Sequence, residues 1–200
     1  MSETPAVYQV PAGPPARRSS ARDRLLAAAD ELFYEDGLHA VGIDRVIERA
    51  GVAKASLYNI FGSKEALIRS YLEAKHAARR GKLERHLQRY ATPRDRILGV
   101  FDLQAELVGE PGFRGCAFVR ASSELKPGSP VKEVCDLTRA WLRGVFMQLA
   151  REAGARQPED LALQLTLLYD GAAVAAQMDG EPGAARRARA VAAALLDMAT

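Results

Sequence analysis

Cysteine is scarce in this chain. The 200 residues contain two cysteines, Cys116 and Cys135, which are too few and too far apart to form a zinc-binding motif. No apolar run approaches the length of a membrane span, and the N-terminus has no continuous apolar core like that of a signal peptide. These absences predict a cytoplasmic protein without a membrane partner. Both thiols should then stay reduced and be buried, as free cysteines usually are.

Recognisable catalytic sequences are also missing. The chain has no glycine-rich phosphate loop, no G-x-S-x-G turn and no H-E-x-x-H zinc motif. Of its three histidines, His76 has the most suggestive position, because Glu73-x-x-His76 has the spacing used by di-iron helical bundles. Such sites need a second copy of this motif and further glutamates, and here Lys75, Arg79 and Arg80 would repel a cation. We therefore expect no metal, no cofactor and no catalysis.

Positive charge is concentrated in the N-terminal half. The net charge is +3, but residues 17–91 hold fifteen Lys and Arg against ten Asp and Glu, whereas residues 92–200 hold thirteen against fourteen. A basic half of this kind is typical of a phosphate-binding surface. An excess of this size also occurs on ordinary solvated helix faces, so the charge alone does not decide between them.

The first 18 residues differ from the rest in composition. They contain four prolines among small residues and end in Arg17-Arg18, which predicts a disordered basic arm over residues 1–18. This arm either reaches into a DNA groove beside the main contact, as homeodomain arms do, or remains a solvated tail.

Residues 41–61 have the pattern of two short helices joined by a glycine turn. Ile43, Val46 and Ile47 recur at i, i+3 and i+4 and give the first helix one apolar face. Gly51 ends this helix, since glycine accepts the left-handed conformation of a helix end at no steric cost.

The second short helix, at residues 54–61, is too short to be stable alone in water. Leu57 and Phe61 lie at i and i+4 and can anchor it on neighbouring helices. Its outward residues are small, polar or basic: Lys54, Ala55, Ser56, Tyr58 and Asn59. An anchored helix that presents such groups fits the recognition helix of a helix-turn-helix, which places it against DNA.

The stretch from Ala50 to Leu67, A-G-V-A-K-A-S-L-Y-N-I-F-G-S-K-E-A-L, resembles the helix-turn-helix signature of tetracycline-repressor-like (TetR family) regulators. The resemblance implies an all-α protein. It implies a three-helix DNA-binding domain over residues 19–80 and a helical regulatory, ligand-binding and dimerisation domain over residues 81–200. Gly42 and Ala53 depart from the family pattern, which usually has Ser or Thr at both places. Glycine still serves as an N-cap but alanine does not, so one usual hydroxyl contact is expected to be missing.

The outward face and the resemblance together predict the DNA contacts. We expect Asn59, Ser56 and Lys54 to read bases, since Asn pairs bidentately with adenine and Lys with guanine. Lys64 and Tyr58 flank the recognition helix and are expected to contact phosphates. The complete predicted set is Arg22, Gly42, Ile43, Lys54, Ala55, Ser56, Tyr58, Asn59 and Lys64.

The remainder of the chain has helical patterns throughout. A long helix from Lys64 towards Tyr90 leaves the DNA-binding domain and is expected to act as a lever, with a bend or break at Gly81. The helix expected over residues 158–179 has a second apolar face, formed by Leu163, Leu167, Val174 and Met178. A helix that is apolar on two sides must be buried on two sides. Together with a final helix over residues 182–198, this predicts a two-fold homodimer; a well-buried helix pair in a monomer is the alternative.

The predicted function is that of a sequence-specific regulator of transcription that binds double-stranded DNA. We expect a repressor that a small, mainly apolar ligand releases from a palindromic operator. The candidate ligand contacts are Phe101, Gln104, Cys116, Phe118, Trp141 and Tyr169, which fit an ordinary helical core nearly as well. The alternatives are a regulator without a ligand, an activator, an architectural DNA-binding protein of low specificity and a helical-bundle enzyme.

Overall fold

The computed structural model describes residues 19–181 and 183–200, and in these ranges every regular element is an α-helix. The expected arm at residues 1–18 and the expected helix start at Pro182 lie outside the described residues. The helices are α1 (Ala21–Asp36), α2 (Ile43–Ala50), α3 (Lys54–Phe61), α4 (Lys64–Leu87), α5 (Pro93–Val108), α6 (Ala117–Glu124), α7 (Pro130–Glu152), α8 (Pro158–Asp179) and α9 (Ala184–Ala199). The predicted all-α fold is confirmed. Among the described helices, none is long and apolar enough to cross a membrane.

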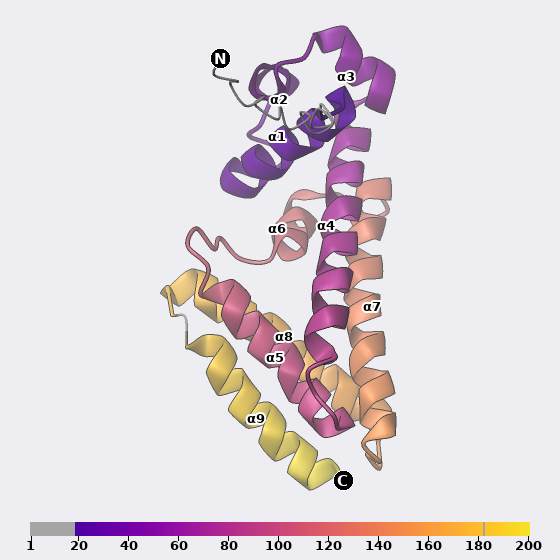
Figure 1. Ribbon diagram of the computed structural model, residues 1–200, viewed down its shortest axis with the longest axis vertical. Helices are drawn as coiled ribbons and strands as arrows, with labels where there is room; N and C mark the ends of the chain where they lie inside the picture. Colours follow the sequence, from indigo (N-terminus) through magenta and orange to yellow (C-terminus); the bar gives the residue numbers. More distant parts are fainter. Residues whose placement is uncertain (1–18, 182) are drawn as a thin grey trace, which may run out of the picture.

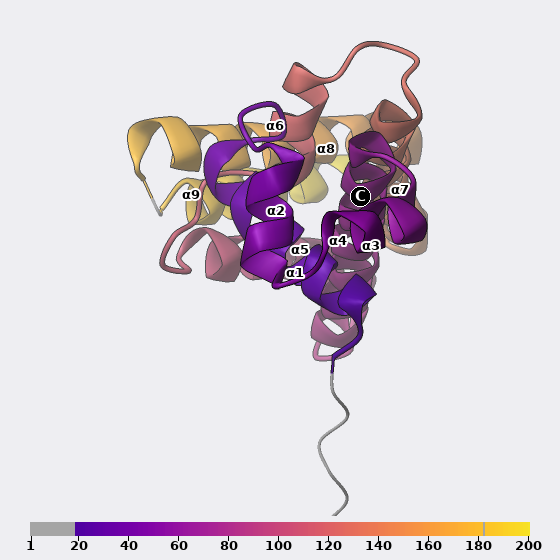
Figure 2. The same cartoon turned by 90° about the horizontal axis from the view of Figure 1, so that it is seen from above.

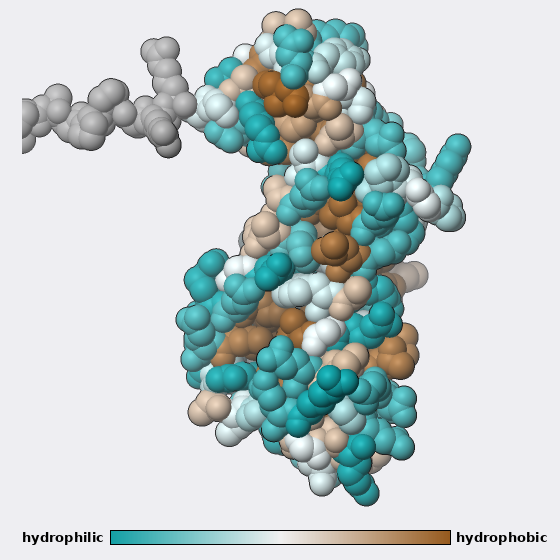
Figure 3. All heavy atoms as spheres, turned by 90° about the vertical axis from the view of Figure 1, so that its right-hand side faces the viewer, coloured by the Kyte–Doolittle hydropathy of each residue, from teal (hydrophilic) through white to brown (hydrophobic). Residues whose placement is uncertain are grey.

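The molecule is elongated, with α1, α2 and α3 at one end and α5, α8 and α9 at the other (Figure 1). We call α1–α3 the head and the helices α5, α7, α8 and α9 the body. α4 runs from the head into the body and packs along α7, and the short α6 lies between the two parts. Figure 2 looks down on the head, whose helices cover the near end of α4. Figure 3 shows that the outline narrows between head and body.

Helix starts in the head are capped unequally. The backbone N–H of Asp23 donates to Ser20 Oγ at 3.1 Å, and the Asp23 carboxylate accepts from the Ser20 N–H at 3.1 Å, so α1 begins with a capping box. Gly42 and Ala53, which precede α2 and α3, provide no side-chain hydrogen bond. The two helices of the helix-turn-helix are therefore held by packing.

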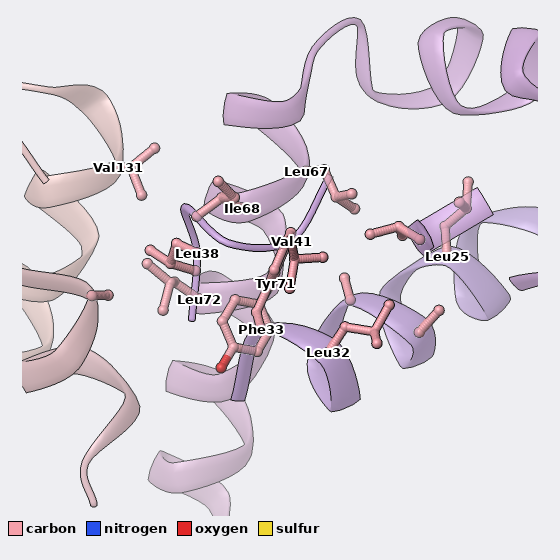
Figure 4. Close-up of a cluster of buried hydrophobic side chains, with 14 of the residues drawn as sticks. Leu25, Leu32, Phe33, Leu38, Val41, Leu67, Ile68, Tyr71, Leu72 and Val131 are labelled. Atoms are coloured by element: carbon pink, nitrogen blue, oxygen red, sulfur yellow. The ribbon is translucent and has the colours of Figure 1, made fainter. Parts of the chain in front are cut away.

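The head contains one apolar core. Leu25, Val41, Leu57 and Leu67 are fully buried in it. Side chains from α1, from the loop before α2 and from α4 point toward one another there (Figure 4). The same cluster includes Val131 at the start of α7, so the head packs directly against part of the body.

α4 belongs to both parts of the molecule. It is helical without interruption through Gly81, so the expected break at this glycine is not present. Leu67 and Leu72 pack in the head core, whereas Leu83 packs in the body core. The expected domain boundary at residue 80 thus falls inside one continuous helix.

The body core is built around three aromatic rings. The ring centroids of Phe101 and Phe146 are 5.8 Å apart, and that of Tyr169 lies 5.9 Å and 6.3 Å from them. These residues come from α5, α7 and α8. Small residues of α9, among them Ala188 and Ala192, are buried against the same cluster and allow close helix packing.

Candidate DNA-binding surface and ligand cavity

α2 and α3 meet at a turn that requires glycine. Gly51 adopts the left-handed conformation, with φ 62° and ψ 44°. Its N–H donates to the Glu48 carbonyl at 3.1 Å, and the Val52 N–H donates to the Ile47 carbonyl at 3.2 Å, which closes the end of α2. Leu57 is fully buried on the other side of the turn, so α3 is held by one face.

The opposite face of α3 is open to solvent. Lys54, Ala55, Tyr58 and Asn59 are exposed there, and Ser56 is half-buried. Lys54 Nζ lies 2.9 Å from a carboxylate oxygen of Asp44 on α2, and this hydrogen bond raises the pKa of Lys54. Because both side chains are largely exposed, such a pair contributes little to stability and can be exchanged for a DNA contact.

Three other predicted DNA contacts surround the helix-turn-helix. Arg22 is exposed, and its guanidinium carbon lies 5.7 Å from the ring centroid of Phe61, the last residue of α3. Gly42 is exposed just before α2. The Ile43 side chain packs partly against the head core, which leaves its backbone N–H at the helix start as the group able to meet a phosphate.

Lys64 lies in a different environment from the residues of α3. It is half-buried at the N-terminus of α4, and burial lowers its pKa while Glu124 acts in the opposite direction. Ser63 caps the same helix end by accepting from the Ala66 N–H at 3.1 Å. A phosphate at this helix end would meet both the lysine and the positive end of the helix dipole.

A cavity of about 380 Å³ lies between α4, α5, α6, α7 and α8, and Tyr34 of α1 also reaches it. Its walls are mainly apolar and include Val100, Leu103, Leu107, Phe118, Leu142 and Ala173. Four of the six predicted ligand contacts line it: Gln104, Cys116, Phe118 and Tyr169. Cys135 is buried, but Cys116 is half-buried at this cavity, so the expectation that both thiols are buried was wrong for Cys116.

The other two predicted ligand contacts, Phe101 and Trp141, are not among the residues that line the cavity. Phe101 is fully buried in the body core. The Trp141 ring packs edge-on against His76, with centroids 5.5 Å apart, and His76 Nδ1 lies 3.1 Å from the Thr138 hydroxyl. Periodicity indicates that both aromatic residues face the core. It does not indicate whether they line the cavity or pack against other side chains. In the described part of the chain, no three His, Cys, Asp or Glu side chains gather as a metal site would require.

Sequence reasoning missed the polar residues that α4 contributes to the cavity. Lys75, Arg79 and Lys82 are spaced i, i+4 and i+7, which places them on one face of the helix, and all three line the cavity. In the sequence, Lys75 and Arg79 stand out only as charges that would repel a metal ion beside His76. The sequence signal that could have indicated them is a line of three cations on one face of a helix that enters an apolar core.

α6 and the residues just before it connect the cavity to the head. α6 carries Phe118, which lines the cavity, and Arg120, whose Nη1 donates to the backbone carbonyl of Tyr34 at 2.5 Å. The Tyr34 hydroxyl accepts from the Arg114 N–H at 2.9 Å, just before α6. At the other end of α6, the Glu124 carboxylate accepts from the His39 N–H at 2.9 Å. A movement of α6 at the cavity wall would therefore shift the hydrogen bonds that α6 makes with α1 and with the loop that precedes α2.

The body also presents apolar side chains to solvent. Leu163, Leu167, Val174 and Met178 on α8 are exposed, as are Val191 and Met198 on α9. Leu167 is 66% exposed and Met178 is 79% exposed. The opposite face of α8, which includes Leu161 and Leu165, is buried in the body core. The two apolar faces predicted for this helix are thus both present, and the outer one is uncovered in a single protomer.

Comparisons with known proteins agree with this geometry. Residues 25–71 match the sequence pattern of "Bacterial regulatory proteins, tetR family". A solved structure from Streptomyces avermitilis, described as a TetR transcriptional regulator, has 34% identity and a TM-score of 0.82, and the match covers 90% of this chain and 98% of that one. A TetR-family regulator from Streptomyces coelicolor has a TM-score of 0.85 and 29% identity, with 90% and 95% of the two chains covered. The transcriptional repressor NemR of Escherichia coli is 32% identical over 137 residues, which are 68% of this chain and 61% of NemR.

Proposed function

This chain belongs to the TetR family of bacterial regulatory proteins, and from that membership we propose that it is a homodimeric repressor that binds a palindromic operator and releases it on binding a small effector. The observation that carries the proposal is the position of α4. This helix begins beside the exposed recognition helix and then lines the cavity of about 380 Å³ in the body. One rigid element thus joins a DNA-binding surface to a space that can hold a ligand.

For DNA recognition, we assign base reading to the outward face of α3. Asn59 and Lys54 are exposed there, and each bidentate contact with a base is worth roughly 1–3 kcal/mol of discrimination. Tyr58, on the same face, and Lys64, at the start of α4, are assigned to phosphates, which position the protein without reading sequence.

Selection of bound DNA from a random pool tests this assignment. It should yield a palindrome whose half-sites are about one helical turn, or a multiple of it, apart. Asn59→Ala should then lose preference at one or two positions of each half-site. Lys64→Ala should weaken binding to all sequences alike and reduce the salt slope by about one unit. Unchanged base preference in Asn59→Ala, or a changed preference in Lys64→Ala, would show that the roles are assigned wrongly.

For assembly, we assign the dimer interface to the outer faces of α8 and α9. An uncovered line of large apolar side chains on two neighbouring helices is what a second copy of the same surface would bury. At Gly171, on the same outer face of α8, a Cβ would meet no other described side chain or neighbouring element within 4 Å, which leaves room for close approach of a partner helix. The dimer would fix the distance between two recognition helices.

For regulation, we assign the transmission of the effector signal to α4 and α6 together. A ligand can shift the two heads only by its differential affinity for the two arrangements, and moving a dimer largely off its operator needs a preference of a few kcal/mol. Arg120 and Glu124 of α6 hold Tyr34 and the backbone of His39, so movement of α6 by a ligand would act on the head.

A reporter assay with the selected operator separates this proposal from its alternatives. A repressor lowers expression from the operator and a compound restores it, whereas an activator raises expression. Arg120→Ala should reduce the response to a compound more than it reduces operator affinity. If no compound in a broad screen alters operator affinity, the protein is a regulator without a ligand. If selection yields no preferred DNA sequence, it is an architectural binder.

A further inference from the structure

The cavity carries more positive than negative charge. The cations Lys75, Arg79 and Lys82 line it, and Glu110 is the one carboxylate among the described residues that form its wall. Lys82 Nζ lies 2.9 Å from Glu110, and Lys75 Nζ lies 2.6 Å from an Asp30 carboxylate oxygen. These two lysines are thus already paired, and Arg79 lies between them on the same face of α4.

Arg79 has no carboxylate within 4 Å in the part of the chain that the structure describes. Its Nη2 donates to the Tyr169 hydroxyl at 3.0 Å, and its Nη1 lies 3.7 Å from Cys116 Sγ, both of which are weak or neutral partners. The Asp170 carboxylate, whose pKa burial raises and the charges of Arg139 and Arg79 lower, forms its ion pair with Arg139, with Nη1 and Oδ2 2.5 Å apart.

Two aromatic rings lie beside Arg79. Its guanidinium carbon lies 5.8 Å from the ring centroid of Phe118 and 5.4 Å from that of Tyr169, and burial desolvates the group. An arginine remains charged in such a place. A desolvated charge is costly unless it is paired, so the site favours the arrival of an anion.

A second polar group in the same cavity lacks a partner. Gln104 is 3% exposed, and its Nε2 donates to the backbone carbonyl of Tyr169 at 2.7 Å. Its Oε1 is buried and has no hydrogen-bond donor among the described residues. Tyr169 therefore connects the two groups, because its hydroxyl contacts Arg79 and its carbonyl contacts Gln104. A ligand with an O–H or N–H group would supply the donor that this buried oxygen lacks.

We propose that the effector is a mainly apolar organic acid, whose anionic group pairs with Arg79 and whose O–H or N–H donates to Gln104 Oε1. The apolar body of the compound would lie on Val100, Leu103 and Leu142. This inference rests on the proposed function in one respect, since it takes this cavity to be the effector site. The charge of the ligand and the donor it carries follow from the cavity alone.

Two fluorescent dyes test the charge directly. 8-Anilinonaphthalene-1-sulfonate has an anionic group, an N–H donor and an apolar body, and N-phenyl-1-naphthylamine is nearly the same molecule without the sulfonate. We expect the wild-type protein to bind the anionic dye at least about tenfold more tightly than the neutral one, which corresponds to about 1.4 kcal/mol. Decanoate should likewise displace the anionic dye more effectively than decan-1-ol does, by a similar factor.

Variants assign this preference to Arg79. Arg79→Met should remove the preference for the anionic dye and leave binding of the neutral dye within about twofold, while Arg79→Lys should keep part of it. Arg80→Met is the matched control, because Arg80 is exposed on α4 and pairs with Glu84 outside the cavity. Gln104→Met, which removes the unpaired oxygen, should weaken binding of both dyes, because each dye carries an N–H.

The outcomes separate this inference from the proposed function. Equal binding of both dyes by the wild type, or an anion preference that survives in Arg79→Met, would overturn the acid assignment even if either dye releases the operator. Binding of neither dye would overturn both the acid assignment and the role of this cavity as the effector site. The dye preference of the wild-type protein tests the inference by itself, so the test remains valid even if a variant fails to fold. Operator affinity, measured by fluorescence anisotropy on labelled DNA, reports the sensor function separately.

Discussion

The dimer interface offers the most direct test, through Leu167→Ala on the outer face of α8. Leu167 is 66% exposed in the protomer. Full burial of a leucine side chain is worth about 1.5–3 kcal/mol, so covering this exposed part would be worth about 1–2 kcal/mol. A two-fold interface contains the residue twice, and the substitution should therefore cost the dimer about 2–4 kcal/mol. Since about 1.4 kcal/mol corresponds to a factor of ten, the dissociation constant should rise about 30-fold to about 700-fold.

Sedimentation velocity over a range of protein concentrations measures this change. Leu137→Ala is the matched control, because Leu137 is 57% exposed but lies on α7. It should leave the dissociation constant unchanged. Leu161→Ala, on the buried face of α8, should lower the free energy of unfolding of the protomer instead. A folded wild-type monomer, or a dimer that Leu137→Ala weakens and Leu167→Ala does not, would refute the assignment of the interface.

Two further predictions concern stability. Ser20→Ala should lower the free energy of unfolding by about 1 kcal/mol, because it removes the capping box of α1, whereas Ala53→Ser should raise it by a similar amount by supplying the cap that α3 lacks. Urea denaturation checks both, and a shift in the same direction for both variants would contradict the capping argument. Burial lowers the pKa of His76, and the charges of Arg80 and Arg79 lower it further, so the unfolded chain binds a proton here more readily than the folded one. Stability from this histidine should therefore be lost as the pH falls below about 6.5. His76→Gln should reduce the dependence of the melting temperature on pH between about 7.5 and 5.5. An unchanged dependence would show that His76 does not contribute to the loss of stability.

The helix-turn-helix was predictable from the sequence because its signals are local. Gly51 ends α2 through its own backbone conformation, and Leu57 and Phe61 lie one helical turn apart, so neither signal depends on distant residues. The two faces of α8 were predictable for the same reason, since periodicity assigns each side chain to a side of its own helix. The uninterrupted course of α4 through Gly81 was not predicted, because packing on both sides of the glycine outweighs its low helix propensity.

The cavity was decided by tertiary structure. Its wall combines α1, α4, α5, α6, α7 and α8, and no spacing along the chain indicates that Tyr34, Arg79 and Gln104 meet there. Phe101 and Trp141 carry the same apolar signal as Phe118, yet of the three Phe118 alone is among the described residues that line the cavity. Helical periodicity indicates which side of a helix is apolar, because this depends on the helical repeat alone. Which buried residues surround an open space, and whether a buried charge finds a partner, depend on how the helices cross, and this only the folded chain decides.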